Sequence, residues 1–550
     1  MSNKSRKFTG VAFLDIEKAF DRVRPEILLT LLAKFGLPLK ILKFIKALTS
    51  GRHLIGFAAG INLQNRDTTI GLPQGSILSP ILFNLYIAFS HSVLPDSVKI
   101  LYYADDIAIY CTDGQLEFIK DQMNNALDGL FRVGNGNIRF SSTSRFLSVV
   151  LDSELNWKAH VNHLRNRIMP RVNILKAMAG IRWGAHHSNL LNVYKGFIRP
   201  LLDWGCQSFN PLNEQFYLRV SRLQYASLRI VSGMMITTPT NVLLDINGEF
   251  PLDSRWFCLT SRFLAKTMVR YSHPLRQLII DLRDQQDIEK SIITSIDSFH
   301  LPGYLDFPYE CRHYDLSINT DLGRQVAADP DPVSSFERLT SSFEFDDTFY
   351  TDGSRTESDG RVGYAAFSLE LDLEYKNRIN NNCTEAEALA IQYAVDTVLN
   401  KKIRKAVIFS DSLSVLSNLE NPVSTGILHC GILKIKRSLF ECFKQAFEVH
   451  IFWIPSHRGI PGNERADVLA KESLRLPDTF LLSKCHYTNL YSKFKALSKS
   501  RASQTILSES HYKGARYFNH VRDVLAPPWY SNKKILRRIF RDQLLPLSQD

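Results

Sequence analysis

The sequence lacks the cysteine patterns that would assign it to a disulfide-rich or zinc-binding class. Its eight cysteines are scattered and contain no C-x-x-C pair, which argues against a disulfide framework, a zinc knuckle and a zinc ribbon. We expect free thiols in a reducing compartment, either the nucleus or the cytoplasm. We expect no signal peptide, because the basic start MSNKSRKFTG is followed by a strand-like acidic motif and not by an apolar segment.

Long hydrophobic runs are also scarce. The stretch from Gly75 to Leu94 is uncharged and long enough to be compared with a membrane span. It contains early breaks at Gly75 and Pro80, and polar residues such as Asn84 and His91. We therefore expect a buried helix here and no membrane partner.

Acidic residues are fewer than basic ones. The chain has 67 Lys and Arg against 55 Asp and Glu, which gives a net charge of +12. A basic surplus of this size indicates an anionic partner, most often nucleic acid, although a merely soluble basic protein is an equally good interpretation of charge alone. A length of 550 residues predicts two to four domains.

Hydrophobic periodicity divides the chain into two different patterns. The first predicts strands at 11–15, 101–110 and 146–152, and helices over 25–50 with a break near Gly36-Leu37-Pro38. From Trp157 to about Tyr271 the pattern is mostly helical with interleaved basic residues. An Asp- and Pro-containing stretch at 302–345 resembles a linker.

The second pattern begins at Phe345. It predicts strands at 346–352, 361–370, 373–380, 405–410 and 448–454. It predicts helices at 384–400, between the strand 405–410 and about residue 446, and from Asn463 onward. Strands followed by alternating helices and strands indicate a mixed α/β domain. The remaining segment, 477–550, is expected to be a polar helical tail, and it ends in the basic cluster Lys533, Lys534, Arg537, Arg538 and Arg541.

A first group of carboxylates lies at predicted strand ends. Asp15 ends the strand in FLDIEKAFDRV, and Asp105 and Asp106 are adjacent in LYYADDIAIY. Adjacent carboxylates repel each other, and their burial is costly unless a cation neutralises them. Neighbouring strands could bring all three together as a hard-oxygen site for Mg²⁺, suited to in-line phosphoryl transfer. For any one of these residues alone, a turn or cap is the more usual role.

Four motifs in order within 150 residues carry a family resemblance. FLDIEKAFDRV, GLPQGSILSPILFNLYI, YADD and FLSVVLDSELNW resemble the polymerase motifs of reverse transcriptases, most closely those of jockey-like arthropod non-LTR retrotransposons. The resemblance implies that Asp15, Asp105 and Asp106 bind metal. It implies that Phe20 lies under the incoming sugar and that Gln74 and Gly75 lie near the nascent base pair. It also implies a helical thumb at 156–301 whose basic residues contact phosphates.

The chain departs from this family at three points. Only fourteen residues precede Asp15, so we expect the fingers to be missing. No K-T pair follows Asp106, where the family carries a lysine that serves as general acid. FLS stands where FLG is usual. We therefore expect the polymerase half to be impaired, because positioning and electrostatic stabilisation would both be weakened.

A second group of acidic residues lies in the later pattern. FYTDGS and VIFSDSLSVL place Asp352 and Asp411 at strand ends, and ERADVLAKES places Asp467 on a helix. CTEAEALAI opens another helix with Glu385 and Glu387. Four such carboxylates could converge on one sheet edge and support two-metal phosphodiester cleavage with water as nucleophile. His457, in a loop, suits proton transfer or product release.

The order Asp, Glu, Asp, His, Asp with these flanks strongly resembles the ribonuclease H domain of the same retrotransposons. The resemblance covers about 346–476. It implies that Asp352, Glu387, Asp411 and Asp467 bind metal, with Glu387 preferred to Glu385 because AEALAI matches the family pattern. It also implies hydrolysis of the RNA strand of RNA–DNA hybrids, which such enzymes recognise by backbone shape and the 2′-hydroxyl.

Together these patterns predict a multidomain chain of the α+β and α/β classes. The predicted parts are a partial right-hand polymerase palm (1–155), a helical thumb or connection (156–301), a linker (302–345), a ribonuclease H domain with a mixed sheet (346–476) and a basic helical tail (477–550). The predicted cofactor is Mg²⁺, with Mn²⁺ as a substitute, and the predicted partners are RNA–DNA hybrid, RNA template and DNA primer. The alternative is a non-catalytic nucleic-acid-binding remnant of a mobile element.

Overall fold

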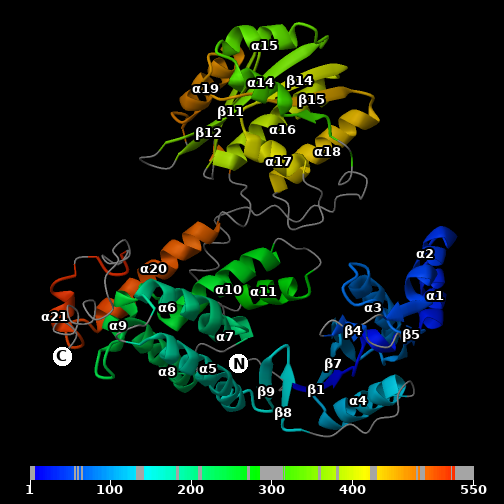
Figure 1. Ribbon diagram of the computed structural model, residues 1–550, viewed down its shortest axis with the longest axis vertical. Helices are drawn as coiled ribbons and strands as arrows, with labels where there is room; N and C mark the ends of the chain where they lie inside the picture. The colour runs from blue at the N-terminus through cyan, green and yellow to red at the C-terminus, as the bar shows by residue number, and fades with distance from the viewer. Residues whose placement is uncertain are drawn as a thin grey trace. The chain divides into compact units, whose positions relative to one another are not determined.

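A computed structural model of the chain contains two compact units, described separately below (Figure 1). The first comprises 1–177, 195–205 and 213–224, and the second comprises 178–194, 206–212 and 225–550. The structure describes residues 7–54, 57–58, 61–62, 66–131, 141–180, 185–208, 214–268, 273–284, 314, 316–356, 361–379, 383–420, 430–477, 481–482, 490–521 and 523–526. None of the helices in these ranges has both the length and the hydropathy needed to cross a membrane.

A three-stranded antiparallel sheet forms part of the first unit. Its strand order is β1 (Phe8–Asp15), β7 (Asp106–Asp113) and β6 (Lys99–Tyr103). Helix α4 (Leu116–Phe131) covers the sheet, and its Ile119 and Met123 share a core with Ile109 and Cys111 of β7. The apolar, β-branched composition of β7 is explained by this burial.

Three helices of the first unit surround a second core. They are α1 (Pro25–Lys34), α2 (Leu39–Thr49) and α3 (Ser79–Ala88), and Leu28, Leu32 and Phe83 are buried among them. The predicted break near 36–38 is confirmed, since Gly36 adopts φ 75° after α1. The predicted helix is confirmed as α3 followed by a 3₁₀ turn, Phe89–Val93, but only one side of α3 is buried, since Ile81 is exposed. Short strand pairs join β2 (Arg52–Leu54) to β5 (Arg66–Thr68) and β3 (Phe57–Ala58) to β4 (Ile61–Asn62).

Two segments predicted as single strands are hairpins, so these two predictions are wrong. The segment 101–110 turns at Ala104 and Asp105 between β6 and β7, and Ala104 has φ 53°. The segment 146–152 turns at Leu147 and Ser148 between β8 (Thr143–Phe146) and β9 (Val149–Asp152). Both turns use left-handed backbone at non-glycine residues, so glycine did not mark them in the sequence. The first turn also places Asp105 outside the strand that contains Asp106.

The segment between the two predicted enzyme domains is helical, as predicted for 157–271. Its helices are α5 (Lys158–Met178), α6 (His187–Val193), α7 (Arg199–Asp203), α8 (Glu214–Ser232), α9 (Thr240–Ile246) and α10 (Leu252–Met268), followed by α11 (Leu275–Asp284). A π-helical turn, Tyr194–Ile198, and a 3₁₀ turn, Cys206–Ser208, lie between them.

A seven-stranded mixed sheet organises the later part of the second unit. Its order is β10 (Ile318–Asn319), β15 (Glu448–Trp453), β14 (Lys405–Ser410), β11 (Asp347–Arg355), β12 (Val362–Ser368), β13 (Leu373–Ile379) and β16 (Leu481–Leu482). Strands β11, β12 and β13 are antiparallel neighbours, whereas β10, β15, β14 and β11 run parallel. The predicted strands and their order along the chain are confirmed.

Helices cover both faces of this sheet (Figure 1). On one face lie α16 (Cys383–Lys401), α17 (Leu413–Glu420) and α18 (Cys430–Lys444), which bury Phe349 and Ile408 of the sheet. On the other face lie α14 (Asp321–Ala328), α15 (Pro332–Thr340) and α19 (Pro461–Ser473). Val407 and Phe409 pack against this second group because successive side chains of a strand point to opposite faces.

The stretch expected to be a linker differs from that expectation. Within 302–345, residues 318–340 form β10, α14 and α15, and these elements join the sheet and its core. The Asp and Pro residues that resembled a loop instead begin a helix. Asp331 caps α15 by accepting a hydrogen bond from the Ser334 N–H, and Pro332 occupies the first turn.

Part of the predicted tail is also packed. Helix α20 (Leu490–Ser508) lies on α10, where the Ser498 hydroxyl donates to the Ser254 carbonyl. After the short helix α21 (Ala515–Phe518), the Leu525 N–H donates to the Asp245 carboxylate at 2.6 Å. The tail therefore stabilises the helical region. The basic cluster at 533–541 lies outside the described residues.

Candidate active site

The structure brings the three carboxylates of the first group to one end of the β1–β7–β6 sheet. Asp15 lies directly opposite Asp106 across the β1–β7 ladder, and Asp105 lies in the adjoining turn. Partial burial, followed by the charges of Asp105 and Asp15, raises the pKa of Asp106. Arg145 on β8 opposes this shift. The three carboxylates do not form a group with all ligand atoms within 4.8 Å of one another.

Of the other residues predicted for the polymerase site, Phe20 packs against the adjoining helical core and the other two lie outside it. The Phe20 ring stacks on Phe83 with ring centroids 4.6 Å apart. The Gln74 side-chain amide donates to the Asp21 carboxylate at 3.0 Å. Gly75 adopts φ 86° and has open space around its Cα. Phe20 thus contributes to packing, whereas Gln74 and Gly75 lie in a surface turn.

The second group lies where the parallel pairing of β11 with β14 ends, although β11 itself continues past Asp352 to Arg355. Thr351 of β11 pairs with Ser410 of β14, so the next residues, Asp352 and Asp411, reach the same edge of the sheet. Asp352 is only 6% exposed. The Trp453 indole N–H donates to the Asp411 carbonyl at 3.0 Å and fixes the backbone after β14.

Helix α16 supplies Glu387 to this edge. The ligand atoms of Asp352, Glu387 and Asp411 lie within 4.8 Å of one another, and Glu385 is not in this group. Glu387 is 8% exposed. Gly353 permits the close approach of the helix, because a Cβ there would lie 3.0 Å from the Glu387 backbone nitrogen and 3.1 Å from its Cδ.

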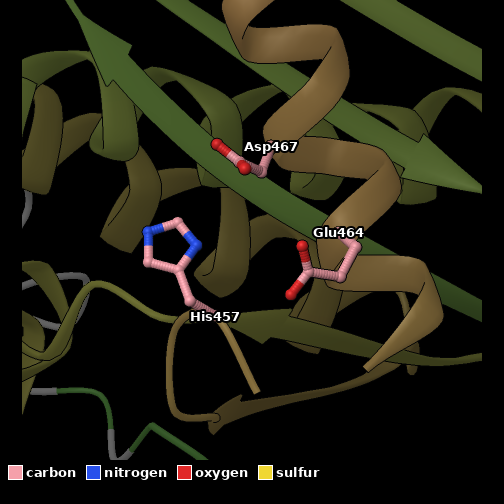
Figure 2. Close-up of side chains that lie close together, drawn as sticks. All are labelled: His457, Glu464 and Asp467. Atoms are coloured by element: carbon pink, nitrogen blue, oxygen red, sulfur yellow. The ribbon is translucent and has the colours of Figure 1, made fainter. Parts of the chain in front are cut away.

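Helix α19 and the loop before it supply the remaining groups. Asp467 is buried and lies within hydrogen-bonding reach of Asp352. His457 is exposed and has φ 52°. Figure 2 shows His457 on the loop, facing Glu464 and Asp467, which project from successive turns of the same helix. Their ligand atoms also lie within 4.8 Å of one another.

Two residues near this site were missed by the sequence analysis. Glu464 precedes Asp467 by three residues, and Lys471 follows it by four, so helical spacing places all three on one face. The Lys471 ammonium lies 2.6 Å from the Asp467 carboxylate. Glu464 also accepts a hydrogen bond from the Gly459 N–H at 3.2 Å, which anchors the His457 loop. The helical period was the signal that could have identified both.

The electrostatics of the site favour a cation. Burial and the neighbouring Asp411 raise the pKa of Asp352 to about 8. Burial, followed by the charges of Asp352 and Asp411, raises the pKa of Glu387 well above its usual value. Burial also raises the pKa of Asp411, while the nearby His457 lowers it. Each shift means that the carboxylate charges lack sufficient compensation within the protein.

The donor set fits a hard divalent cation. All three ligands of the first cluster are carboxylates, the type that Mg²⁺ and Mn²⁺ prefer. Among the described residues, Glu387 Oε2 is buried without a hydrogen-bond partner, as expected for an oxygen that binds a ligand. A cation at Asp352, Glu387 and Asp411 would neutralise the charges that raise their pKa values.

Comparison with known proteins agrees with this geometry. Residues 1–132 match the family model for reverse transcriptase (RNA-dependent DNA polymerase), and residues 345–475 match the model for RNase H. Two parts of the chain are thus similar to a reverse transcriptase segment and to a ribonuclease H domain. The predicted fold class and the resemblance to non-LTR retrotransposon proteins are confirmed.

Relatives of the chain come from insect mobile elements. A probable RNA-directed DNA polymerase from transposon X-element of Drosophila melanogaster is 26% identical over 267 residues. The RNA-directed DNA polymerase from mobile element jockey of Drosophila funebris is 25% identical over the same length. Each match covers 42% of this chain and 29% of the relative, so the chain matches less than a third of these proteins.

Solved structures similar to the chain include ribonucleases H. The RNase H1 of Halobacterium salinarum is 20% identical and covers 23% of this chain and 96% of its own, with a TM-score of 0.20. LC11-RNase H1, solved with an RNA/DNA hybrid, is 17% identical and covers 23% of this chain and 96% of its own, with the same TM-score. The assignment of the ribonuclease H domain depends on the family match and the sheet topology.

Proposed function

We propose that the ribonuclease H domain hydrolyses the RNA strand of RNA–DNA hybrids with the aid of divalent cations, Mg²⁺ or alternatively Mn²⁺. The observation that supports this most directly is the buried cluster of Asp352, Glu387 and Asp411, with ligand atoms within 4.8 Å of one another and raised pKa values. A charged cluster of this kind has no packing role that apolar residues could not fill better.

Each residue has a distinct task in this proposal. Asp352, Glu387, Asp411 and Asp467 would hold the metal, which when bound would activate water and stabilise the leaving oxygen. His457 is exposed on its loop and is suited to moving a proton or assisting product release. Lys471 stabilises the charge of Asp467 and restricts its rotamer.

The substrate is proposed from the family and not from a bound ligand. Ribonuclease H enzymes distinguish hybrids by the 2′-hydroxyl and by backbone geometry, so we expect weak sequence preference. The basic surplus of the chain, +12, is consistent with a polyanionic substrate. Together with the reduced cysteines, these properties support a location in the nucleus or the cytoplasm.

For the reverse transcriptase segment, we propose impaired RNA-directed DNA synthesis on an RNA template with a DNA primer. Asp15, Asp105 and Asp106 are the proposed ligands there. Unlike the ribonuclease H cluster, they do not bring one oxygen from each residue within 4.8 Å of the other two. Asp15 and Asp105 are also exposed, so their carboxylates are only weakly organised by the protein.

Cleavage of a 5′-labelled RNA strand annealed to DNA tests the main proposal. The wild-type chain with Mg²⁺ should release short RNA fragments, and Asp352→Asn should release none while still binding the hybrid in a gel shift. The alternative function, a non-catalytic nucleic-acid-binding remnant, predicts binding by both proteins and cleavage by neither. Single-stranded RNA of the same sequence controls for a contaminating nuclease.

A further inference from the structure

A cavity of about 450 Å³ lies between α5 and α8, and no carboxylate of either group lines it. All of its lining residues belong to the first compact unit. Figure 1 shows the two helices side by side. The lining residues are Val161, Asn162, Arg165 and Met169 of α5, and Arg219, Arg222 and Leu223 of α8. We call this cavity the α5–α8 groove.

The rim of the α5–α8 groove is basic. Arg165 of α5 and Arg219 and Arg222 of α8 line the groove, and all three residues are exposed. Within the described part of the chain, none of the three guanidinium groups has a hydrogen bond or an ion pair. Helix α5 contains five Lys and Arg residues over 21 positions and no Asp or Glu. Such a surface leaves strong positive potential for an anionic ligand.

The floor of the groove is apolar. Val161 and Leu223 are buried, and Met169 is half-buried beside them. Low-dielectric walls strengthen the field of the arginines at the rim. Asn162 adds an amide that can donate and accept hydrogen bonds. The groove thus offers three different surfaces to a ligand. The arginines suit a charged backbone, the apolar floor suits the face of a ring, and Asn162 suits the polar edge of that ring.

We propose that the α5–α8 groove binds an unpaired stretch of nucleic acid, with phosphates on the three arginines and a base over the apolar floor. A duplex has its base faces stacked inside and would use only the rim, whereas a single strand can also cover Met169 and Leu223. Because every base has an apolar face, the site should accept many sequences. This inference depends on the proposed function only in taking nucleic acid as the substrate.

The salt dependence of binding measures the contribution of the arginines. Fluorescence anisotropy with a labelled single strand of about 10 nucleotides should be recorded over a range of salt concentrations. EDTA prevents cleavage. Arg219→Gln combined with Arg222→Gln removes two phosphate contacts and should reduce the slope of log Kobs against log salt by about 1.4. The ratio of wild-type affinity to variant affinity should therefore be about 25-fold larger at 0.1 M salt than at 1 M salt.

Matched variants separate charge, floor and folding effects. Arg324→Gln combined with Arg338→Gln makes the same charge change on α14 and α15 and should leave the slope unchanged. Arg219→Lys combined with Arg222→Lys keeps the charge and should restore the slope, which a folding defect would prevent. Met169→Ala should weaken binding without altering the slope.

Other probes define the results that overturn the proposal. Equal slopes for the groove variant and the control variant would exclude the site. A slope change with a blunt RNA–DNA hybrid but not with the single strand would identify a duplex contact instead. Loss of calorimetric pyrophosphate binding without a change in single-strand binding would identify a small-anion site. At saturating substrate, the groove variant should cleave the hybrid at the wild-type rate. Absence of cleavage by the wild type would contradict the ribonuclease proposal alone, because the salt slope tests the groove independently.

Discussion

Replacement of Asp352 by Asn should stabilise the metal-free ribonuclease H domain at alkaline pH. The Asp352 carboxyl is buried beside Asp411, Asp467 and Glu387, and its pKa is raised to about 8. In the unfolded chain the same carboxyl has an ordinary pKa near 3.9. Between these values the folded state retains a proton that the unfolded state has lost. Stability must therefore fall as the pH rises through this window.

The magnitude follows from this linkage. Each pH unit within the window costs about 1.4 kcal/mol per retained proton, so the change from pH 5 to pH 8 costs up to about 4 kcal/mol. Asn cannot ionise and is nearly isosteric with Asp. Below the unfolded pKa of about 3.9 the wild-type carboxyl is protonated in both states and its charge no longer distinguishes the two proteins, whereas at pH 5 the variant should already be the more stable by about 1.5 kcal/mol. At pH 8 the variant should be the more stable protein.

Hydrogen exchange of the full chain in EDTA provides the assay. Peptides from β14 report opening of the sheet that holds Asp352. Comparison at equal pH cancels the intrinsic exchange rates. The ratio of the wild-type exchange rate to that of the variant should rise by up to about 1,000-fold between pH 5 and pH 8. Equal or faster exchange of the variant at pH 8 would refute the argument from buried charge.

Three further predictions concern the same site. Divalent cation affinity, measured by calorimetry, should rise with pH by about tenfold per pH unit for each proton displaced. The observed binding enthalpy should change with the ionisation enthalpy of the buffer, because the buffer takes up the released protons. A pH-independent affinity would contradict the raised pKa values. Gly353→Ala should cost about 1–3 kcal/mol and lower hybrid cleavage, because its Cβ would press on Glu387; unchanged cleavage and hydrogen exchange would contradict this. His457→Asn should slow hybrid cleavage about 100-fold without changing hydrogen exchange, since the residue is exposed and Asn tolerates its positive φ; wild-type turnover would exclude its proposed role.

The sequence predicted most of the ribonuclease H architecture because each element has a simple local cause. Strands β14 and β15 are rich in β-branched and aromatic residues and each is followed by a helix, whereas β11 is followed by the antiparallel strand β12. Parallel pairing of β11 and β14 then places Asp352 and Asp411 at one edge, although β11 continues past Asp352, which was expected to end its strand. The preference for Glu387 over Glu385 came from a family pattern, and the structure adds a reason, since Gly353 admits Glu387 to the cluster.

The features that could not be predicted depend on backbone choices without a residue signature. Ala104, Leu147 and Ser148 adopt left-handed conformations that sequence rules reserve for glycine or asparagine, so two hairpins were taken as strands. Helices α14 and α15 are short and begin with turn-forming residues, and their stability comes from packing against the sheet. The α5–α8 groove required tertiary structure, because Arg165 lies more than 50 positions from Arg219 and Arg222 in the sequence.

The most direct test of the account compares Glu387→Gln with Glu385→Gln in cleavage of a 5′-labelled RNA–DNA hybrid at several Mg²⁺ concentrations. The two variants make the same change two positions apart on α16, at side chains that are both buried. The account predicts that Glu387→Gln abolishes cleavage at every Mg²⁺ concentration, whereas Glu385→Gln retains it. Cleavage by Glu387→Gln at the wild-type rate would contradict the assignment of the Asp352, Glu387 and Asp411 cluster as the active site.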